Sequence, residues 1–394
     1  MEVIYLDNNA TTRVDRAVID AMLPYFEENY GNPSSMHTFG GRVGAAVETA
    51  RQQVADLIGA TADEIVFNSC GTESDNTAIQ ATLASYPDKR HIITSRVEHP
   101  AIKSLYEALA KKGYRTTFVP VDREGNLDLD YLYDHLSDDT AIVSLMWANN
   151  ETGVIFPIEE ISRYVSDRGI VFHTDAVQAA GKLPIDVSQT GVNLLSLSGH
   201  KIHGPKGVGA LYVRKGTKFS PFMIGGHQEK GRRGGTENTA SLVGLGKAAE
   251  LTRERINRGD YDCVQELRDK LENTLLAEVP HTLLNGNRNR RLPNTSSIAF
   301  EYVEGESILL MLNEHGICAS SGSACTSGSL EPSHVLRAMG VPYTAAHGSI
   351  RFSLSSYTTE KEIDFVLQKV PPIIERLRKM SPFWQQAVEK TQIA

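Results

Sequence analysis

One lysine, Lys201, lies in the stretch of the chain whose residue types are best suited to covalent chemistry. Apolar residues 194–197 predict a short strand that leads into Ser198 and His200, and a Gly/Pro-rich turn separates Lys201 from a second expected strand over residues 209–213. An amine held where two strands meet is partly removed from water, which lowers its pKa and lets it act as nucleophile and base. For this residue alone, a solvated turn lysine is the alternative interpretation.

Other polar residues are expected at equivalent places in the same sheet. Between about residues 65 and 213, apolar segments of strand length alternate with helical patterns, which is typical of a mostly parallel sheet covered on both faces. Ligands of such sheets bind at the carboxyl ends of the strands. The polar residues that the sequence puts at this edge are Gly71, Thr72, His99, Asn150, Asp175, Gln178, Ser198, His200 and Lys201.

Each of these residues has a functional and a structural interpretation. Gly71 and Thr72 open a helix, whose free amides suit a phosphate, although an ordinary N-cap has the same pattern. Asp175 ends a buried strand and needs a cation, either a protonated ring nitrogen or a salt-bridge partner. His99 could stack on a ring and move protons, or it could be a structural histidine. The functional interpretation therefore depends on these residues acting as a set.

The order of expected elements divides the chain into two domains. A helix is expected from Arg16 into Phe26, another over residues 40–58, and one long charged helix over residues 251–278 as a connector. After it the pattern changes to strand 296–300, helix 306–314, strand 316–319, loop 320–331 and strand 349–354, which indicates a smaller α+β domain. We therefore expect a large α/β domain over residues 15–260 and a small domain formed by residues 1–14 and 261–394.

Composition limits the classes of partner and the compartment. The 394 residues have a formal net charge of −8, which gives no support for a nucleic acid or an anionic membrane as partner. The first residues lack the basic start and apolar core of a signal peptide, and no apolar run reaches the length of a spanning helix, so a cytoplasmic protein is expected. The four cysteines form no CxxC pair, so neither a disulfide framework nor a zinc site is indicated.

One cysteine, Cys325, lies in a loop of unusual composition. Residues 320–329 are almost entirely Ser, Gly, Ala and Thr, which cannot bury enough apolar surface to order the segment, so a mobile loop is expected. Such a loop could bring a thiolate to a substrate and then present the product to another protein. The alternative is a surface loop with an incidental thiol. His99 or His334 could lower the pKa of this thiol, and the sequence does not choose between them.

Nine motifs occur in one order along almost the whole chain. They are YLDNNATT (5–12), GNPSS (31–35), GTESDN (71–76), EHP (98–100), ANNETG (148–153), HTDAVQAAGK (173–182), SGHKIHGPKG (198–207), RRGGTEN (232–238) and SSGSACTSG (320–328). Together they resemble the cysteine desulfurases, which are pyridoxal-phosphate enzymes of the class V aminotransferase family with the aspartate-aminotransferase fold (fold type I).

The resemblance implies a role for each site residue. Lys201 would bind the cofactor aldehyde covalently, Asp175 would pair with the ring nitrogen, and His99 would stack on the ring and handle protons. Arg351 would clamp the substrate carboxylate, together with Asn150. The remaining cofactor contacts would come from Gln178 and Asn150 at the phenolic edge, and from Gly71, Thr72, Ser198, His200 and, across a homodimer interface, Thr236 at the phosphate.

The family resemblance also implies a reaction and a destination for the sulfur. L-cysteine would give L-alanine and a persulfide on Cys325, and the sulfur would pass to an iron-sulfur scaffold protein, with Cys325 as a transient metal ligand. The details of the cysteine loop are most similar to the NifS branch, which serves nitrogenase maturation. Two alternatives remain: a selenocysteine lyase or aminotransferase of the same fold, and a sulfur carrier or scaffold without catalysis. Loss or retention of turnover without Cys325, and a visible cofactor band, would distinguish them.

Overall fold

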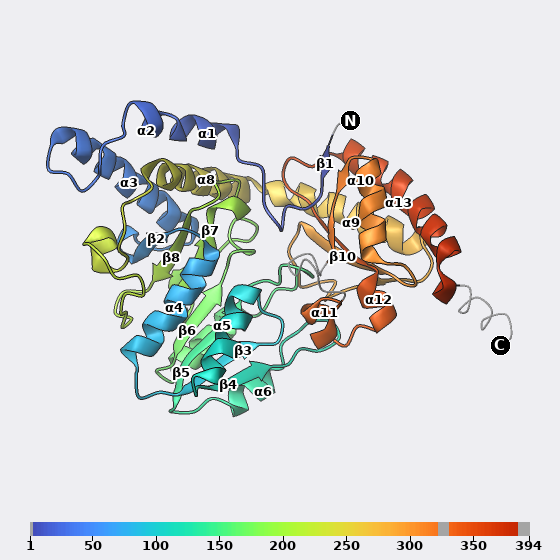
Figure 1. Ribbon diagram of the computed structural model, residues 1–394, viewed down its shortest axis with the longest axis horizontal. Coiled ribbons are helices and arrows are strands. Elements are labelled where there is room, and N and C mark those ends of the chain that lie inside the picture. The colour runs from blue at the N-terminus through green and yellow to red at the C-terminus, as the bar shows by residue number, and fades with distance from the viewer. Residues whose placement is uncertain (1–2, 322–330, 385–394) are drawn as a thin grey trace.

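A seven-stranded sheet forms the centre of the computed structural model, which describes residues 3–321 and 331–384 (Figure 1). Its strand order is β2-β8-β7-β6-β5-β3-β4, and every neighbouring pair is parallel except the two pairs made by β8. The strands are β2 (Ile65–Asn68), β3 (His91–Ser95), β4 (Arg115–Val119), β5 (Thr140–Met146), β6 (Val171–Asp175), β7 (Leu194–Ser198) and β8 (Gly209–Val213). The predicted mostly parallel α/β sheet is confirmed.

Helices cover both faces of this sheet because its strands are apolar on both sides. Successive residues alternate between two hydrophobic clusters: Ile92 packs with the helices of one face and Ile93 with those of the other. In Figure 1, α4 and α5 lie across the first face, while α3 and α8 pack on the second. Helix α7 contributes Ile161 and Val165 to the cluster of that second face. The helices are α3 (Thr38–Leu57), α4 (Gly71–Ser85), α5 (Pro100–Lys111), α6 (Leu129–Asp134), α7 (Ile158–Ser166) and α8 (Thr239–Arg258).

The C-terminal part of the chain forms a second sheet with its own hydrophobic cluster. The strand order there is β12-β13-β10-β9, and all its pairs are antiparallel. The strands are β9 (Thr282–Leu284), β10 (Thr295–Phe300), β12 (Ser320–Ser321) and β13 (Ser349–Ser353). The helices are α9 (Asp260–Glu278), α10 (Gly305–Glu314), α11 (His334–Ala338), α12 (Tyr343–His347) and α13 (Glu360–Met380).

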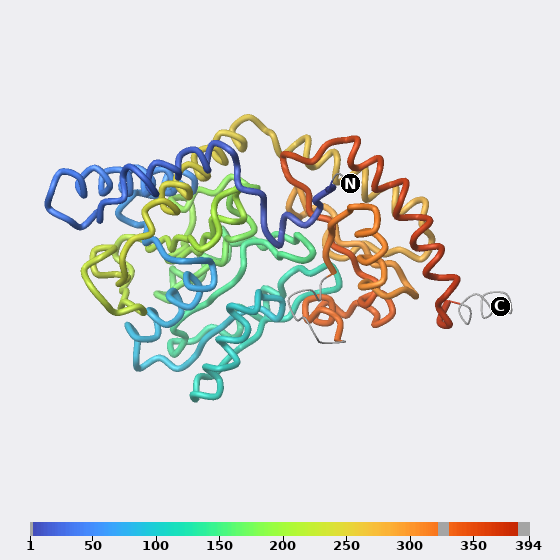
Figure 2. Tube along the Cα trace, turned by 45° about the horizontal axis from the view of Figure 1, so that its top comes forward, coloured from blue at the N-terminus to red at the C-terminus, as the bar shows by residue number. Residues whose placement is uncertain are grey.

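The N-terminal segment connects these two parts. Strand β1 (Ile4–Tyr5) pairs in parallel with β11 (Ile317–Cys318), and Ile4 and Leu6 belong to the hydrophobic cluster of the C-terminal part. In both views the chain then crosses to α1 (Arg16–Met22) and α2 (Pro24–Glu27) beside the large sheet (Figure 2). We call residues 6–12 the arm. It runs between the two sheets, at the place where the site residues lie.

Two helix predictions are wrong in their continuity. The long helix expected over residues 251–278 is part of two helices, α8 and α9, because Gly259 adopts a left-handed φ of 75° that ends the first helix. The helix expected from Arg16 into Phe26 is also interrupted, since Pro24 begins the separate short helix α2. Loop 320–331 begins with a short strand at Ser320–Ser321 rather than with loop.

The expected division of the chain at residue 260 stays a prediction. The larger hydrophobic cluster draws residues from α3, α7 and α8 but also includes Leu336 and Ala345 from the C-terminal part.

Among the helices in the described part of the chain, none has both the length and the apolar character needed to cross a membrane.

Candidate active site

A cavity of about 520 Å³ lies at the carboxyl ends of the parallel strands, bounded on the other side by the arm and β12–β13. It brings together most of the residues that the sequence singles out. Those in its wall are Gly71, Thr72, His99, Asn150, Asp175, Gln178, Ser198, His200, Lys201 and Arg351. Because they come from elements spread over most of the chain, their convergence is a property of the fold and not of any one motif.

Lys201 is held against the arm. It closes a single 3-10 turn, Gly199–Lys201, that directly follows β7. Its Nζ donates hydrogen bonds to the carbonyl oxygens of Asn9, at 2.6 Å, and Ala10, at 2.8 Å. The arm also fixes the backbone of this turn, because Thr12 donates to the carbonyl of His200 through both its N–H and its hydroxyl group. The amine is therefore oriented into the cavity wall and not into bulk solvent.

A phosphate-sized group has suitable donors beside this lysine. The first amides of α4, at Gly71 and Thr72, have no partner inside the helix, and they carry the positive end of its dipole. The Oγ atom of Ser198 is buried and makes no hydrogen bond among the described residues. A Cβ atom at Gly71 would lie 2.9 Å from Val177 and 3.6 Å from Ser198, so glycine keeps this space open. The local structure thus fits an anion.

Asp175 and His99 both line the cavity, and each affects the pKa of the other. Burial raises the pKa of Asp175, and the nearby His99 and Lys201 oppose that shift. Burial also lowers the pKa of His99, so its ring is neutral near pH 7. His99 caps α5, and its Nδ1 accepts a hydrogen bond from the N–H of Ala101 at 3.2 Å. Since a backbone N–H can only donate, the proton of the neutral ring must be on Nε2.

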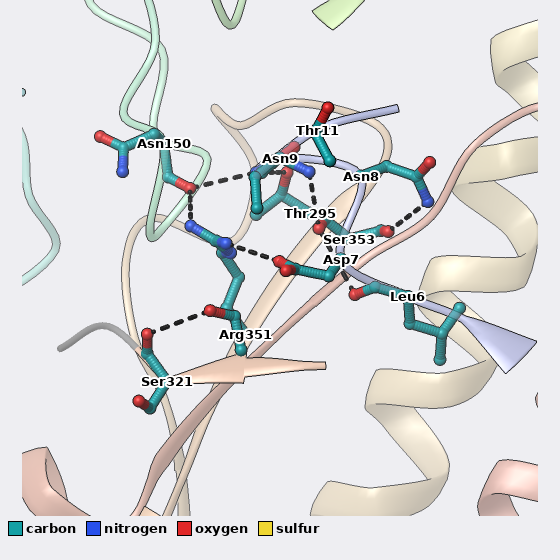
Figure 3. A network of polar contacts seen from close by, with 12 residues as sticks. Leu6, Asp7, Asn8, Asn9, Thr11, Asn150, Thr295, Ser321, Arg351 and Ser353 are labelled. Atoms are coloured by element: carbon teal, nitrogen blue, oxygen red, sulfur yellow. Dashed lines mark hydrogen bonds and ion pairs between the residues drawn. The ribbon is translucent and has the colours of Figure 1, made fainter. Parts of the chain in front are cut away.

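Arg351 lies on β13 and reaches the cavity beside the arm (Figure 3). One Nη atom donates to Asp7 at 2.7 Å and the other donates to the carbonyl of Asn150 at 3.0 Å. The residue is only 5% exposed, and its buried Nε atom makes no hydrogen bond among the described residues. A guanidinium with an unused N–H donor can still accept a carboxylate ligand.

Asn9 joins the arm to both sides of the site. Its carbonyl accepts hydrogen bonds from Lys201 and from the amide of Gln178. Figure 3 shows its own side chain, which donates to Thr295 and to the carbonyl of Asn150. The arm therefore fixes the distance between the lysine turn and the second sheet.

Several residues of the cavity wall were not singled out from the sequence. The charged or amide residues among them are Asp7, Asn9, Asp75 and Glu151. Asp7 and Asn9 belong to the motif YLDNNATT, which carried the resemblance without an assigned role. Burial raises the pKa of Glu151 to about 7 and that of Asp75 well above its usual range. These two carboxyls also belong to motifs that carried the resemblance, GTESDN and ANNETG, and the fold adds that both are buried.

Two expected site residues are not among the described residues of the cavity wall. Cys325 lies outside the described residues, although Ser320 and Ser321, shortly before it, line the cavity. Thr236 is exposed and is not part of the cavity wall in a single chain. His334, one candidate for lowering the pKa of the thiol, is bound through Nε2 to the carbonyl of Glu98 at 2.9 Å. No cluster that could hold a metal ion occurs within residues 3–321 and 331–384.

The donor set fits pyridoxal phosphate. The free amides and the unpartnered hydroxyl suit its phosphate, Asp175 suits its ring nitrogen, and Lys201 suits its aldehyde. The unpartnered Ser198 hydroxyl is the sharpest sign, because a buried polar group without a partner is costly unless a ligand satisfies it.

Comparisons with known proteins give one consistent result. The family model described as aminotransferase class-V matches residues 4–366. The chain is 60% identical over 385 residues to cysteine desulfurase NifS of Azotobacter vinelandii, which covers 98% of this chain and 96% of that one. It is 59% identical over 397 residues to a cysteine desulfurase of Trichormus azollae, with 99% of each chain covered. A solved NifS-like protein, 38% identical, superposes with a TM-score of 0.89 over 95% of this chain and all of that one.

Proposed function

We propose that this chain, which belongs to the aminotransferase class-V family, is a cysteine desulfurase: a pyridoxal-phosphate enzyme that takes sulfur from L-cysteine and leaves L-alanine. The observation that carries the proposal is a single cavity that combines Lys201, Asp175 and Arg351. These are an amine for an aldehyde, a carboxylate for a ring nitrogen and a guanidinium for a substrate carboxylate.

The cofactor, when bound, supplies an electron-withdrawing ring that stabilises negative charge at the α-carbon of the substrate. The chain supplies position and proton transfer. Asp175 holds positive charge at the ring nitrogen, which in turn keeps this buried carboxyl ionised. Lys201 is the base for the α-proton, and in the cofactor-free chain its contacts with Asn9 and Ala10 keep the amine at the cavity wall. Asn150 and Gln178 lie at the edge of the same cavity.

Arg351 and His99 orient the substrate and handle its protons. The unused Nε donor of Arg351 is available for the carboxylate of L-cysteine, while Asp7 and Asn150 fix the guanidinium plane. Because Nδ1 of His99 is occupied by a backbone N–H, this histidine presents a proton on Nε2 to the cavity. It acts first as a proton donor, and it can take up a proton only after giving that one away.

Sulfur leaves the substrate through Cys325. The Cys325 thiolate attacks the substrate sulfur, the bond from sulfur to the β-carbon breaks, and the released electron pair takes up a proton, so alanine and a persulfide are the two products. No further oxidant is needed. Support comes from Ser321 in the cavity wall, since Cys325 follows it by four positions and an extended chain covers at most ~14 Å over that length.

The decisive experiment uses purified protein and L-cysteine alone. Alanine is measured, and the peptide that contains Cys325 is analysed by mass spectrometry for one added sulfur. We expect both products from the wild type, and neither alanine turnover nor the adduct from Cys325→Ala. Cys263→Ala is the matched control, because Cys263 is exposed and lies on α9.

The outcomes separate the alternatives. Alanine without an adduct on Cys325 would indicate a lyase that releases sulfur directly. Full turnover in Cys325→Ala would indicate an aminotransferase or a selenocysteine lyase, and a wild-type protein without a visible cofactor band would indicate a sulfur carrier.

The finer features of the function belong to the same proposal. The chain acts as a cytoplasmic homodimer in which Thr236, exposed in the single chain, reaches the phosphate in the partner's site. Its sulfur goes to an iron-sulfur scaffold protein, and similarity to the NifS protein of Azotobacter vinelandii favours nitrogenase maturation as the destination. Cys325 could hold iron transiently during transfer. Solution mass, and weaker cofactor retention in Thr236→Ala, test the shared site.

A further inference from the structure

A second lysine, Lys182, lies next to the site without entering it. Its side chain is buried, with 6% of the residue exposed, and it is not part of the cavity wall. Its Nζ donates to the backbone carbonyl of Gln178 at 3.0 Å and to the side-chain Oε1 of the same residue at 2.9 Å. Both contacts go to one residue, and that residue lines the cavity.

The chemistry of the ammonium group settles the orientation of the Gln178 amide. The two ends of a glutamine amide have nearly the same shape, so the orientation must follow from its partners. In its ammonium form Lys182 has only donors, and the Asn9 carbonyl on the opposite side can only accept, so the atom in contact with Lys182 must be the acceptor Oε1. The Nε2 end must then point the other way, where it donates to the carbonyl of Asn9 at 2.9 Å. An NH₂ group has a second hydrogen, which remains available on that side.

A tight turn makes this contact possible. After β6 the chain folds back over residues 176–183, and Lys182 N–H bonds to the carbonyl of Ala179. Gly181 has a φ of 85°, and a Cβ there would lie 2.6 Å from Ile202 and 2.8 Å from Thr252. This position therefore requires glycine, both for its backbone conformation and for the close approach. The turn brings the Lys182 amine beneath the glutamine.

We propose that Lys182 is a positioning residue that locks the Gln178 amide with Nε2 toward the cavity, so that this N–H donates to the phenolic oxygen of the bound cofactor. The proposal rests on the proposed function, because it needs a cofactor in the cavity. Without Lys182, the contact with the Asn9 carbonyl alone would hold the Gln178 amide, and a turned amide would present Oε1, which repels a phenolate instead of donating to it.

A merely electrostatic role is the competing explanation. The other cations near Lys182 are Lys201 and Arg351, and burial together with these two lowers the pKa of Lys182 to about 7. Removing a nearby positive charge would make it easier for the cofactor to keep a proton, and losing a donor to its phenolic oxygen would do the same. In a variant of Lys182 alone, the two explanations therefore predict the same direction of shift in the pH at which the bound cofactor loses its proton. They make different predictions only when the Lys182 variant is combined with a variant of Gln178.

The experiment follows the visible band of the holoenzyme as a function of pH. Because a donor to the phenolic oxygen weakens the hold of that oxygen on the neighbouring proton, Lys182→Met should raise the pH midpoint by about one unit, a tenfold change in the proton equilibrium. Gln178→Ala should raise it by a similar amount. In the double variant, Lys182→Met should add no shift to that of Gln178→Ala, because the lysine acts through the glutamine.

A full additional shift of the midpoint in the Gln178→Ala background would overturn the proposal in favour of charge, and an unchanged midpoint in Lys182→Met would overturn it outright. If Lys182→Met does not fold, Lys182→Gln decides: an uncharged donor should keep the wild-type midpoint, whereas the charge explanation predicts a raised one. If the wild type itself showed no visible band, the proposed function would fail, and this outcome is distinct from a band that does not shift.

Discussion

The two walls of the cavity differ in how completely their polar groups are satisfied. The sheet wall, at the ends of the parallel strands, contains buried groups with few partners: Ser198 Oγ has none among the described residues, and the Asp175 carboxylate accepts a hydrogen bond from the N–H of Val177. In the arm wall, most groups are saturated. Asn9 alone makes contacts with Ser353, Thr295 and the carbonyl of Asn150.

This difference indicates that the sheet wall mainly binds the ligand, whereas the arm wall mainly fixes the geometry of the site. A buried polar group without a partner destabilises the ligand-free protein and gains most when a ligand arrives, whereas a saturated network holds geometry before any ligand binds. We therefore expect substitutions in the sheet wall to reduce activity with little loss of stability, and substitutions in the arm wall to reduce stability first.

Lys201→Ala should have the largest effect. It removes both the covalent anchor and the base, so turnover of L-cysteine should fall by at least about 10³-fold. The free energy of unfolding should change little, because the hydrogen bonds from Lys201 to Asn9 and Ala10 go to backbone carbonyls at the cavity wall, where water can replace the amine. Alanine formation and denaturant unfolding measure the two quantities. Lys206→Ala is the matched control, since that lysine is exposed and should be dispensable. A collapse in stability of Lys201→Ala would contradict the distinction between the walls.

Asp175→Asn should lower turnover while stabilising the ligand-free protein. The variant cannot hold positive charge at the ring nitrogen, and we expect a loss of about 10²-fold in turnover. Burial raises the pKa of Asp175, so the folded ligand-free protein binds this proton more tightly than the unfolded chain does. Replacing a costly carboxylate by an amide should therefore raise the free energy of unfolding at pH 8, and the amide oxygen can keep the contact with Val177. A fall in unfolding free energy would be the opposite result.

The same substitution, made at a partner of the arm and in the sheet wall, gives the most direct test. Ser353→Ala leaves the buried N–H of Asn9 without its acceptor, which lies at 2.9 Å, and should cost about 1–3 kcal/mol of stability. Ser198→Ala removes a hydroxyl that has no partner, so the ligand-free protein should be as stable as the wild type or more stable. Ser198→Ala should instead weaken cofactor retention. Thermal unfolding of both variants without cofactor measures the two stabilities. Equal losses of stability in the two variants would contradict the difference between the walls.

The sheet wall was largely predictable from the sequence, and the arm wall was not. Strand β8 and the strand that precedes Lys201 have the expected positions to within one residue, because short apolar runs bounded by glycine and polar residues leave little choice of register. Residues that follow such strands meet at one edge by topology alone. The arm has no periodic pattern, since its residues are fixed by contacts with Ser353 and Thr295, more than 280 positions away.

The helix errors have a local cause. The pattern around Gly259 remains amphipathic on both sides of the glycine, so periodicity alone joins α8 and α9 into one helix. A glycine inside a helical pattern can be tolerated or can end the helix, and only the direction of the following chain decides.

The burial of the carboxyls Asp75 and Glu98 could not be predicted from the sequence either, because burial depends on distant strands and not on neighbours in sequence.

Glu98 tests the boundary between the two walls, since it lies beside His99 but is well partnered. Its carboxyl accepts hydrogen bonds from Ser95 at 2.5 Å and from the N–H of Met146 at 3.1 and 3.0 Å. Burial nevertheless raises its pKa from 4.5 to about 8. Between these two pH values the folded state binds more protons than the unfolded chain, so this group makes the free energy of unfolding fall as the pH rises.

Glu98→Gln should remove that fall. Glutamine resembles the protonated carboxyl and does not titrate, so the difference in unfolding free energy between variant and wild type should grow in favour of the variant from pH 5 to pH 8, by at most about 1.4 kcal/mol per pH unit. Denaturant unfolding at a series of pH values measures it. Parallel curves would mean that the contacts with Ser95 and Met146 keep Glu98 ionised, and that its partners, and not its burial, decide its charge.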